Sequence, residues 1–184
     1  LNAALFCNWL SRRDGLRPFY VIKYGNLLGF RPDSTGYRMP TEAEWEWASK
    51  AKGGEKNTFI WGTEYPPPSQ TGNFADESLK GDGEKIIDYN DGFTVSSPVA
   101  SFVSNDKGLF DMDGNVAEWV HDFYSATPET RPEQDPLGPI GGNSHVVKGS
   151  SWKSSSRASL RSAYRTFKEK RASDLGFRIA RYAR

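Results

Sequence analysis

GLFDMDGNVAEWVHDFY, residues 108–124, places acids and an asparagine among apolar residues that favour burial. Four oxygen-bearing side chains lie close together in it: Asp111, Asp113, Asn115 and Glu118. If half buried and unpaired, such groups repel one another, and they either take up a proton or attract a cation. Gly114 allows a backbone with positive φ that turns carbonyl groups inward, and hard cations bind mixtures of carbonyl and carboxylate oxygen. The first hypothesis from these residues is a bound calcium ion.

The main alternative to a calcium site is a tight Asp-Gly turn that joins two strands, residues 108–112 and 116–123. The spacing is not that of an EF-hand, because Gly114 directly follows the second aspartate and Glu118 comes too soon after it. Spacing alone favours the turn.

Length and composition predict one loop-rich domain, residues 1–184, whose core depends on large rings. The chain has 184 residues, 18 Gly, 11 Pro and 14% aromatic residues, with a mean hydropathy of -0.68. A net charge of +1 gives no overall field that would attract nucleic acid. No apolar run approaches the roughly 18 residues of a membrane-spanning helix.

The beginning of the chain lies inside a helical pattern, without an initiator methionine or a signal peptide, so we expect the domain to be N-terminally incomplete. In residues 1–12 the apolar side chains recur at near-helical spacing and predict the core face of a helix: Leu1, Ala4, Leu5, Phe6 and Trp9. The single cysteine, Cys7, is predicted to be buried, and it excludes an intramolecular disulfide.

A second helix is predicted after Thr41, which forms a capping box with Glu44. We expect Trp45 and Trp47 to anchor it in the core and the glycines at 53–54 to end it. A pair between Glu46 and Lys50 is also expected. Short strands are predicted at residues 19–23, 27–30, 145–152 and 176–182.

The segment 57–103 lacks helical periodicity, and a loop of this length inside a compact domain is usually functional or held by something. Asn73 and Asp91 each lie next to a glycine or a phenylalanine and are candidates for a second cation site, although two unrelated turns are the preferred explanation from these residues alone. His121 and His145 are too isolated for a transition-metal site. Asp122 adjoins His121, but neighbours on a strand point to opposite faces.

Seven motifs in order, YRMPTEAEWEWASKA, FIWG, GNFAD, DGF-x4-PV, GLFDMDGNVAEWV, HVVKGSSW and LGFRIAR, resemble the formylglycine-generating enzyme (sulfatase-modifying factor) superfamily. The resemblance covers nearly the whole chain and implies an α+β fold similar to C-type lectins, with short antiparallel sheets and two main helices. It starts late, since a strand and a further block that normally precede the first helix are missing before Leu1.

The resemblance also implies two calcium sites. The first falls on the side chains of Asn73 and Asp91 and on the carbonyls of Phe74 and Phe93. The second falls on Asp111, the carbonyls of Gly114 and Val116, and the carboxylate of Glu118. Asp111 stands where the enzyme has asparagine, which adds negative charge.

The departure from the enzyme lies in residues 153–165, where the family's copper-binding cysteine pair is expected. Ser154 occupies the first cysteine position and the second falls near Ser159. A hydroxyl binds Cu(I) poorly and cannot perform thiol redox chemistry. Formylglycine generation is therefore not expected.

The resulting prediction is a non-catalytic, calcium-binding recognition or regulatory domain of a bacterial exported or envelope protein, in the periplasm, in the envelope or secreted. Its protein or small-molecule ligand is expected at a recognition surface of seven residues: Trp152, Ser154, Ser156, Arg157, Arg161, Tyr164 and Arg165. From composition alone, these arginines equally well pair with local acids. The alternatives are a metal-dependent oxidoreductase of the pyoverdine-maturation type and a ligand-displaying variable protein of a diversity-generating retroelement.

Overall fold

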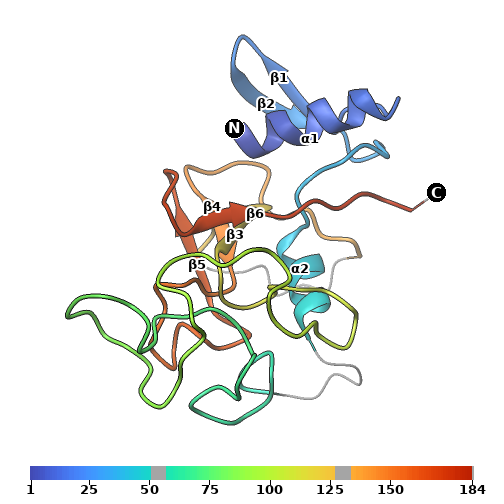
Figure 1. Ribbon diagram of the computed structural model, residues 1–184. Coiled ribbons are helices and arrows are strands. Elements are labelled where there is room, and N and C mark those ends of the chain that lie inside the picture. The colour runs from blue at the N-terminus through green and yellow to red at the C-terminus, as the bar shows by residue number, and fades with distance from the viewer. Residues whose placement is uncertain (51–56, 127–133, 184) are drawn as a thin grey trace.

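The computed structural model describes residues 1–50, 57–126 and 134–183, and it is an α+β structure with long irregular loops (Figure 1). The elements in chain order are α1 (Asn2–Arg13), β1 (Tyr20–Lys23), β2 (Asn26–Phe30), α2 (Glu42–Ser49), β3 (Ala117–Phe123), β4 (His145–Lys148), β5 (Arg165–Lys168) and β6 (Leu175–Phe177). None of the helices in these described ranges is long and apolar enough to cross a membrane.

The N-terminal unit consists of α1 packed on the antiparallel hairpin β1–β2. Cys7 and Ala4 are buried there against Phe19 and Met39, so the prediction for Cys7 is confirmed. The predicted core face of α1 is wrong apart from Ala4, because four of its apolar residues are more than two-fifths exposed: Leu1, Leu5, Phe6 and Trp9.

The buried face of α1 instead carries Asn8 and Ser11, whose polar atoms are satisfied by other segments. The Asn8 Nδ2 atom donates to the Tyr20 carbonyl at 2.8 Å, and the Tyr20 amide donates to Asn8 Oδ1 at 3.1 Å. Ser11 Oγ donates to the Cys7 carbonyl and accepts from the Tyr37 amide. Burial of polar groups costs little when each has a partner, so this face turns inward.

The main sheet has the strand order β5-β4-β3-β6, with β3 between β4 and β6. The pairs β3–β4 and β4–β5 are antiparallel, whereas β6 runs parallel to β3. The predicted strand at 108–112 is wrong, since those residues form bends and irregular backbone. Strand β5 lies in the polar segment for which no strand was predicted.

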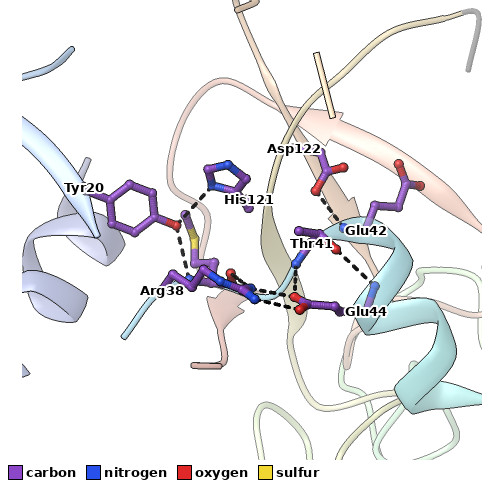
Figure 2. A network of polar contacts seen from close by, with 8 residues as sticks. Tyr20, Arg38, Thr41, Glu42, Glu44, His121 and Asp122 are labelled. Atoms are coloured by element: carbon purple, nitrogen blue, oxygen red, sulfur yellow. Dashed lines mark hydrogen bonds and ion pairs between the residues drawn. The ribbon is translucent and has the colours of Figure 1, made fainter. Parts of the chain in front are cut away.

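The start of α2 follows the predicted capping box (Figure 2). The Glu44 amide donates to Thr41 Oγ1, and the Thr41 amide donates to the Glu44 carboxylate. Arg38, which is fully buried, donates to both Glu44 oxygens at 2.5 and 2.6 Å. The Glu42 amide donates to Asp122 Oδ2 at 2.7 Å, which ties the helix to β3.

The two tryptophans of α2 differ in their environment. Trp45 is buried, as predicted, but Trp47 is 70% exposed, so its expected anchoring role is wrong. The expected pair between Glu46 and Lys50 is present at 2.9 Å. The helix ends at Ser49, and the predicted stop at 53–54 lies outside the described residues.

The loops of residues 57–116 contain only isolated bridges in place of helices or strands. They pack around a cluster of buried rings and aliphatic side chains: Phe59, Phe74, Ile86, Tyr89 and Leu160. In Figure 1 these loops and the N-terminal unit lie at opposite ends of the molecule, with the four-stranded sheet between them. The candidate functional residues therefore lie mainly on loops positioned by the sheet.

Candidate functional site

The first predicted calcium corner is assembled by the Asp91 carboxylate, which joins two loop segments. Asp91 Oδ2 accepts from the Phe74 amide and Oδ1 accepts from the Phe93 amide, both at 2.8 Å. Asn73 is completely buried, and its Nδ2 atom donates to the Val95 carbonyl at 2.7 Å. The fold thus brings together the four residues predicted for this site.

An unsatisfied oxygen and two acids make this first corner suitable for a cation. The Asn73 Oδ1 atom is buried and has no hydrogen-bond partner among the residues that the structure describes. Asp76 is also fully buried, and its Oδ2 atom accepts from the Asp91 amide. Burial raises the pKa of Asp91 to about 6, and the neighbouring Asp76 contributes to the increase. These residues fit a calcium ion, which would supply positive charge and a partner for Asn73 Oδ1.

Asp76 is a residue of this corner that the sequence reasoning missed. It ends the motif GNFAD, so an acid directly after two buried apolar residues was an available signal. Ser78 Oγ lies 2.6 Å from Asp76 Oδ1 and 2.5 Å from the Phe93 carbonyl oxygen, and its single proton is shared between these two acceptors. Asp76 and Ser78 therefore hold the loop that presents the predicted ligands.

The second predicted corner has a different character, because a guanidinium group is bound to the Glu118 carboxylate. Arg178 donates to Glu118 Oε2 at 2.6 Å and to Oε1 at 2.7 Å, and it also donates to the Asp111 carbonyl at 3.0 Å. Trp45 Nε1 donates to Glu118 Oε2 at 2.7 Å. Since both Glu118 oxygens already have a cationic partner, this corner does not fit calcium as the first one does.

The backbone of this second corner turns as the sequence predicted. Gly114 has a φ of 79°, and Asp111 and Asn115 also have positive φ. A Cβ atom at Gly114 would lie 2.6 Å from the Asn73 carbonyl oxygen, so glycine is required for the two corners to approach one another. Val116 follows directly, and binding of calcium by its carbonyl stays a prediction.

Clusters of ionisable metal ligands do not form in the part of the chain that the structure describes. There, no group of three or more His, Cys, Asp or Glu side chains is placed to hold a metal ion. Calcium at the first corner would consequently depend on amide and backbone carbonyl oxygens together with few carboxylates. Calcium accepts such ligands.

The predicted recognition surface begins directly against the two corners. The Trp152 amide donates to the Asn115 carbonyl at 2.9 Å, and the Ala75 amide donates to the Ser154 carbonyl at 3.0 Å. Trp152 Nε1 is buried without a hydrogen-bond partner in the described structure. The start of this surface is thus fixed by backbone contacts to both predicted calcium corners.

The remaining residues of the recognition surface divide into exposed and structural groups. Ser156, Arg157 and Arg161 are exposed, and the Arg157 guanidinium lies 4.7 Å from the centre of the Tyr65 ring. Tyr164 is half-buried.

Arg165, in contrast, serves the fold. It donates to both Glu42 oxygens at 2.8 Å and to the Ser125 carbonyl at 2.9 Å, and it lies 4.8 Å from the centre of the Tyr124 ring. Hydrogen bonding with Glu42 raises the pKa of Arg165 above its ordinary value. The local-acid interpretation of the arginines therefore holds for Arg165.

Comparison with known proteins gives a family match over almost the whole chain. The model of the sulfatase-modifying factor enzyme 1-like domain matches residues 1–183. The formylglycine-generating enzyme of Thermomonospora curvata is 39% identical over 124 residues, which cover 64% of this chain and 39% of that enzyme. The matched region thus spans well under half of the length of this curated relative.

Solved structures show the same fold. Treponema denticola variable protein 1 has a TM-score of 0.76 and 30% identity, covering 96% of this chain and 66% of that one. PvdO from Pseudomonas aeruginosa has a TM-score of 0.69 and 26% identity, covering 98% and 59% respectively. The expected α+β fold of this superfamily is therefore confirmed.

Proposed function

Because the chain belongs to the family of sulfatase-modifying factor enzyme 1-like domains, we propose that it is a calcium-stabilised recognition domain that does not itself generate formylglycine. The observation that carries this proposal is the position of the only thiol. Cys7 is buried in the N-terminal unit, and burial raises its pKa to about 12, whereas a thiolate is the reactive form. Residues 153–165 offer hydroxyl groups instead.

Calcium at the first corner would neutralise Asp91 and satisfy Asn73 Oδ1. A fixed first corner would in turn fix the backbone at the start of the recognition surface. Ser154 receives a hydrogen bond from Ala75, two residues beyond Asn73, so fixing the corner also fixes the backbone that enters the surface. Millimolar calcium outside the cytoplasm suits this arrangement, which supports an exported or envelope protein.

The exposed part of the recognition surface suits a ligand that carries acidic groups. Arg157 and Arg161 present two guanidinium groups, and Tyr65 provides an aromatic contact for the first. Arginine forms paired hydrogen bonds with carboxylates and is a frequent anchor of recognition. We assign the ligand class as a protein or small molecule with exposed carboxylate or other anionic groups.

The catalytic half of the proposal is tested by incubating the purified protein with a sulfatase-derived cysteine peptide, copper and oxygen. Mass spectrometry should show the peptide unchanged, while the enzyme from Thermomonospora curvata, as a control, should convert it. Formation of the aldehyde by the present chain would overturn the proposal.

The recognition half is tested with a displayed peptide library selected against the wild-type protein. Selected peptides should be rich in Asp and Glu, and Arg161→Ala should weaken their binding by about tenfold, equivalent to roughly 1.4 kcal/mol. Arg171→Ala is the matched control because Arg171 is exposed and lies outside the recognition surface. Equal losses in the two variants would reject this surface as the binding face.

Two alternatives rest on the structural relatives. The likeness to Treponema denticola variable protein 1 favours a ligand-display protein, which a nearby template repeat and a reverse transcriptase gene would reveal. A metal-dependent oxidoreductase of the pyoverdine-maturation type stays the second alternative, and the fold is similar to that of PvdO. Stoichiometric iron or copper in the purified protein would support the oxidoreductase, and calcium alone would support the recognition domain.

A further inference from the structure

A groove of about 690 Å³ is lined by residues from α1, from α2 and from the end of β6 with the segment that follows it. In Figure 1 this C-terminal segment runs between the two helices. The described lining residues include no member of the recognition surface. The volume falls within the roughly 300 to 1,000 Å³ of small-molecule sites.

The walls of this groove are mainly aromatic and aliphatic. Trp47 is 70% exposed, and Phe6 and Ile179 are each more than two-fifths exposed. Phe6 packs edge-on against Phe177, with ring centroids 5.7 Å apart, and the Lys107 ammonium lies 5.1 Å from the centre of the Trp47 ring. Single exposed apolar residues are ordinary, but several around one concave site indicate that an apolar molecule binds there.

The two charged side chains among the described lining residues, Glu44 and Arg178, are each paired with an opposite charge. Glu44 accepts from Arg38 through both of its oxygens, and Arg178 donates to both oxygens of Glu118. An ion entering the groove would lose hydration without meeting an unpaired opposite charge in its wall. The wall therefore favours a neutral ligand.

Arg178 nevertheless offers a hydrogen-bond donor. Its Nε and Nη2 atoms donate to Glu118, and Nη2 also donates to the carbonyls of Phe110 and Asp111. Nε and Nη2 form one edge of the planar guanidinium, so Nη1 lies on the opposite edge and points away from the buried Glu118. Nη1 is not buried, and it has no hydrogen-bond partner in the part of the chain that the structure describes.

We propose that this groove binds a neutral aromatic small molecule whose carbonyl oxygen accepts a hydrogen bond from Arg178 Nη1. The ring of the ligand packs against Trp47 and Phe6, which supply exposed aromatic surface. An amide, ester or ketone provides the acceptor without a formal charge. The recognition surface is proposed to bind anionic groups, so the charge of the ligand distinguishes the two sites.

The test uses three probes of matched size: phenylacetamide, phenylacetate and phenethylamine, which are neutral, anionic and cationic at pH 7. NMR titration of the wild-type protein should show that phenylacetamide binds about tenfold more tightly than either ion, because each ion loses its hydration in the groove. Binding should shift the Trp47 indole and Ala180 amide resonances, which belong to the wall. Phenylacetate is the decisive competitor because the Lys107 ammonium lies beside Trp47.

Two variants separate the ring contact from the hydrogen bond. Trp47→Ala should weaken phenylacetamide binding by about tenfold, whereas Tyr24→Ala, at a fully exposed ring in the turn between β1 and β2, should have little effect. Arg178→Lys keeps a cation for Glu118 but removes Nη1, and it should also weaken binding by about tenfold. If Arg178→Lys does not fold, Trp47→Ala decides the question, since its side chain is mostly exposed.

Three results would overturn the proposal. The first is binding of phenylacetate as tight as that of phenylacetamide. The second is full phenylacetamide binding by Trp47→Ala or by a folded Arg178→Lys variant. The third is a set of shifts confined to the recognition surface, which would place the aromatic ligand there instead of in the groove.

Discussion

His121 is a buried histidine whose surroundings favour its neutral form. It packs edge-on against Phe19 and Phe30, and Tyr20 Oη lies 3.4 Å from its Nδ1 atom (Figure 2). Burial, aided by the charge of Arg38, lowers its pKa from 6.5 to about 4. The unfolded chain therefore binds a proton before the folded chain does as the pH falls.

This difference predicts that the contribution of His121 to stability is complete above pH 6.5 and is lost between pH 6.5 and 4. The expected loss is about 3 kcal/mol by pH 4, from roughly 1.4 kcal/mol per pKa unit. Denaturation of wild type and His121→Gln between pH 6.5 and 4 measures this loss. The difference between their free energies of unfolding should decrease on acidification.

Other groups facing His121 are present in both proteins of this comparison. Arg38 and His145 disfavour its protonation and Glu44 favours it. Asp122 acts oppositely, since burial raises its pKa to about 6, so its contribution to stability grows as the pH falls through that value. An imidazole that titrates near pH 6.5 by NMR in wild type would contradict the prediction.

Arg178 decides whether the second corner admits a cation. Arg178→Met should destabilise the fold by about 3 kcal/mol, because it leaves the buried Glu118 carboxylate without its ionic partner. Calcium should restore part of that loss, since Glu118 and the Asp111 carbonyl become available. Melting curves with and without calcium measure the rescue, and Arg171→Met is the control. If calcium does not raise the melting temperature of Arg178→Met, the prediction that Arg178 keeps calcium out of the second corner is contradicted.

Helix α2 is held more strongly by its ion pair than by its cap. Thr41→Ala should cost about 1 kcal/mol as a lost N-cap, whereas Glu44→Ala should cost about 3 kcal/mol because Arg38 stays buried without its partner. Glu46→Ala, which breaks an exposed pair with Lys50, should cost only about 0.3 kcal/mol. Urea denaturation orders the three variants, and a greater loss for Thr41→Ala would contradict this account.

Local signals in the sequence predicted elements that depend on local contacts. The capping box at Thr41 located the start of α2, because its hydrogen bonds join residues three apart. The inward face of α1 was mispredicted, since Asn8 is satisfied by Tyr20, which lies outside the helix. Strand β5 is stabilised by pairing with β4 and has no apolar pattern of its own. No local signal in the sequence therefore indicated this strand.

The candidate site also contains both residues that sequence motifs identify and contacts between residues far apart in sequence. The family motifs identified Asn73 and Asp91, which the fold brings together. The ion pair of Glu118 with Arg178 joins residues 60 apart in sequence, and no spacing rule connects them. The buried position of Asp113 likewise depends on Ser150, which is 37 residues away in sequence and donates to Asp113 Oδ1.

The molecule as a whole is divided between a sheet-centred part and loops that lack regular structure. The described loops of residues 57–116 have their own cluster of buried rings, but few backbone ladders hold them together. Asp91 and Asn73 join loop segments at the first corner, where the Asn73 Oδ1 acceptor has no partner within residues 1–50, 57–126 and 134–183. A cation bound there would therefore stabilise the loops more than the sheet.

Calcium is expected to raise the melting temperature, and a chelator to lower it. At a free concentration about 100 times the Kd, binding adds about 2.7 kcal/mol, or roughly 5 to 10 °C for a domain of this size. Hydrogen exchange should slow at the Phe74 and Phe93 amides, which donate to Asp91, and change little at Val146 in β4.

Asn73→Ala removes the unsatisfied acceptor and should abolish the calcium-dependent increase in melting temperature. Asn143→Ala, at an exposed asparagine away from this corner, should retain it. Comparison of these two variants distinguishes binding of calcium by Asn73 from a general effect of divalent ions on surface charge. The general effect would be the same in both variants. A wild-type melting curve that is unchanged by excess chelator would mean that the loops are held by their rings and hydrogen bonds alone.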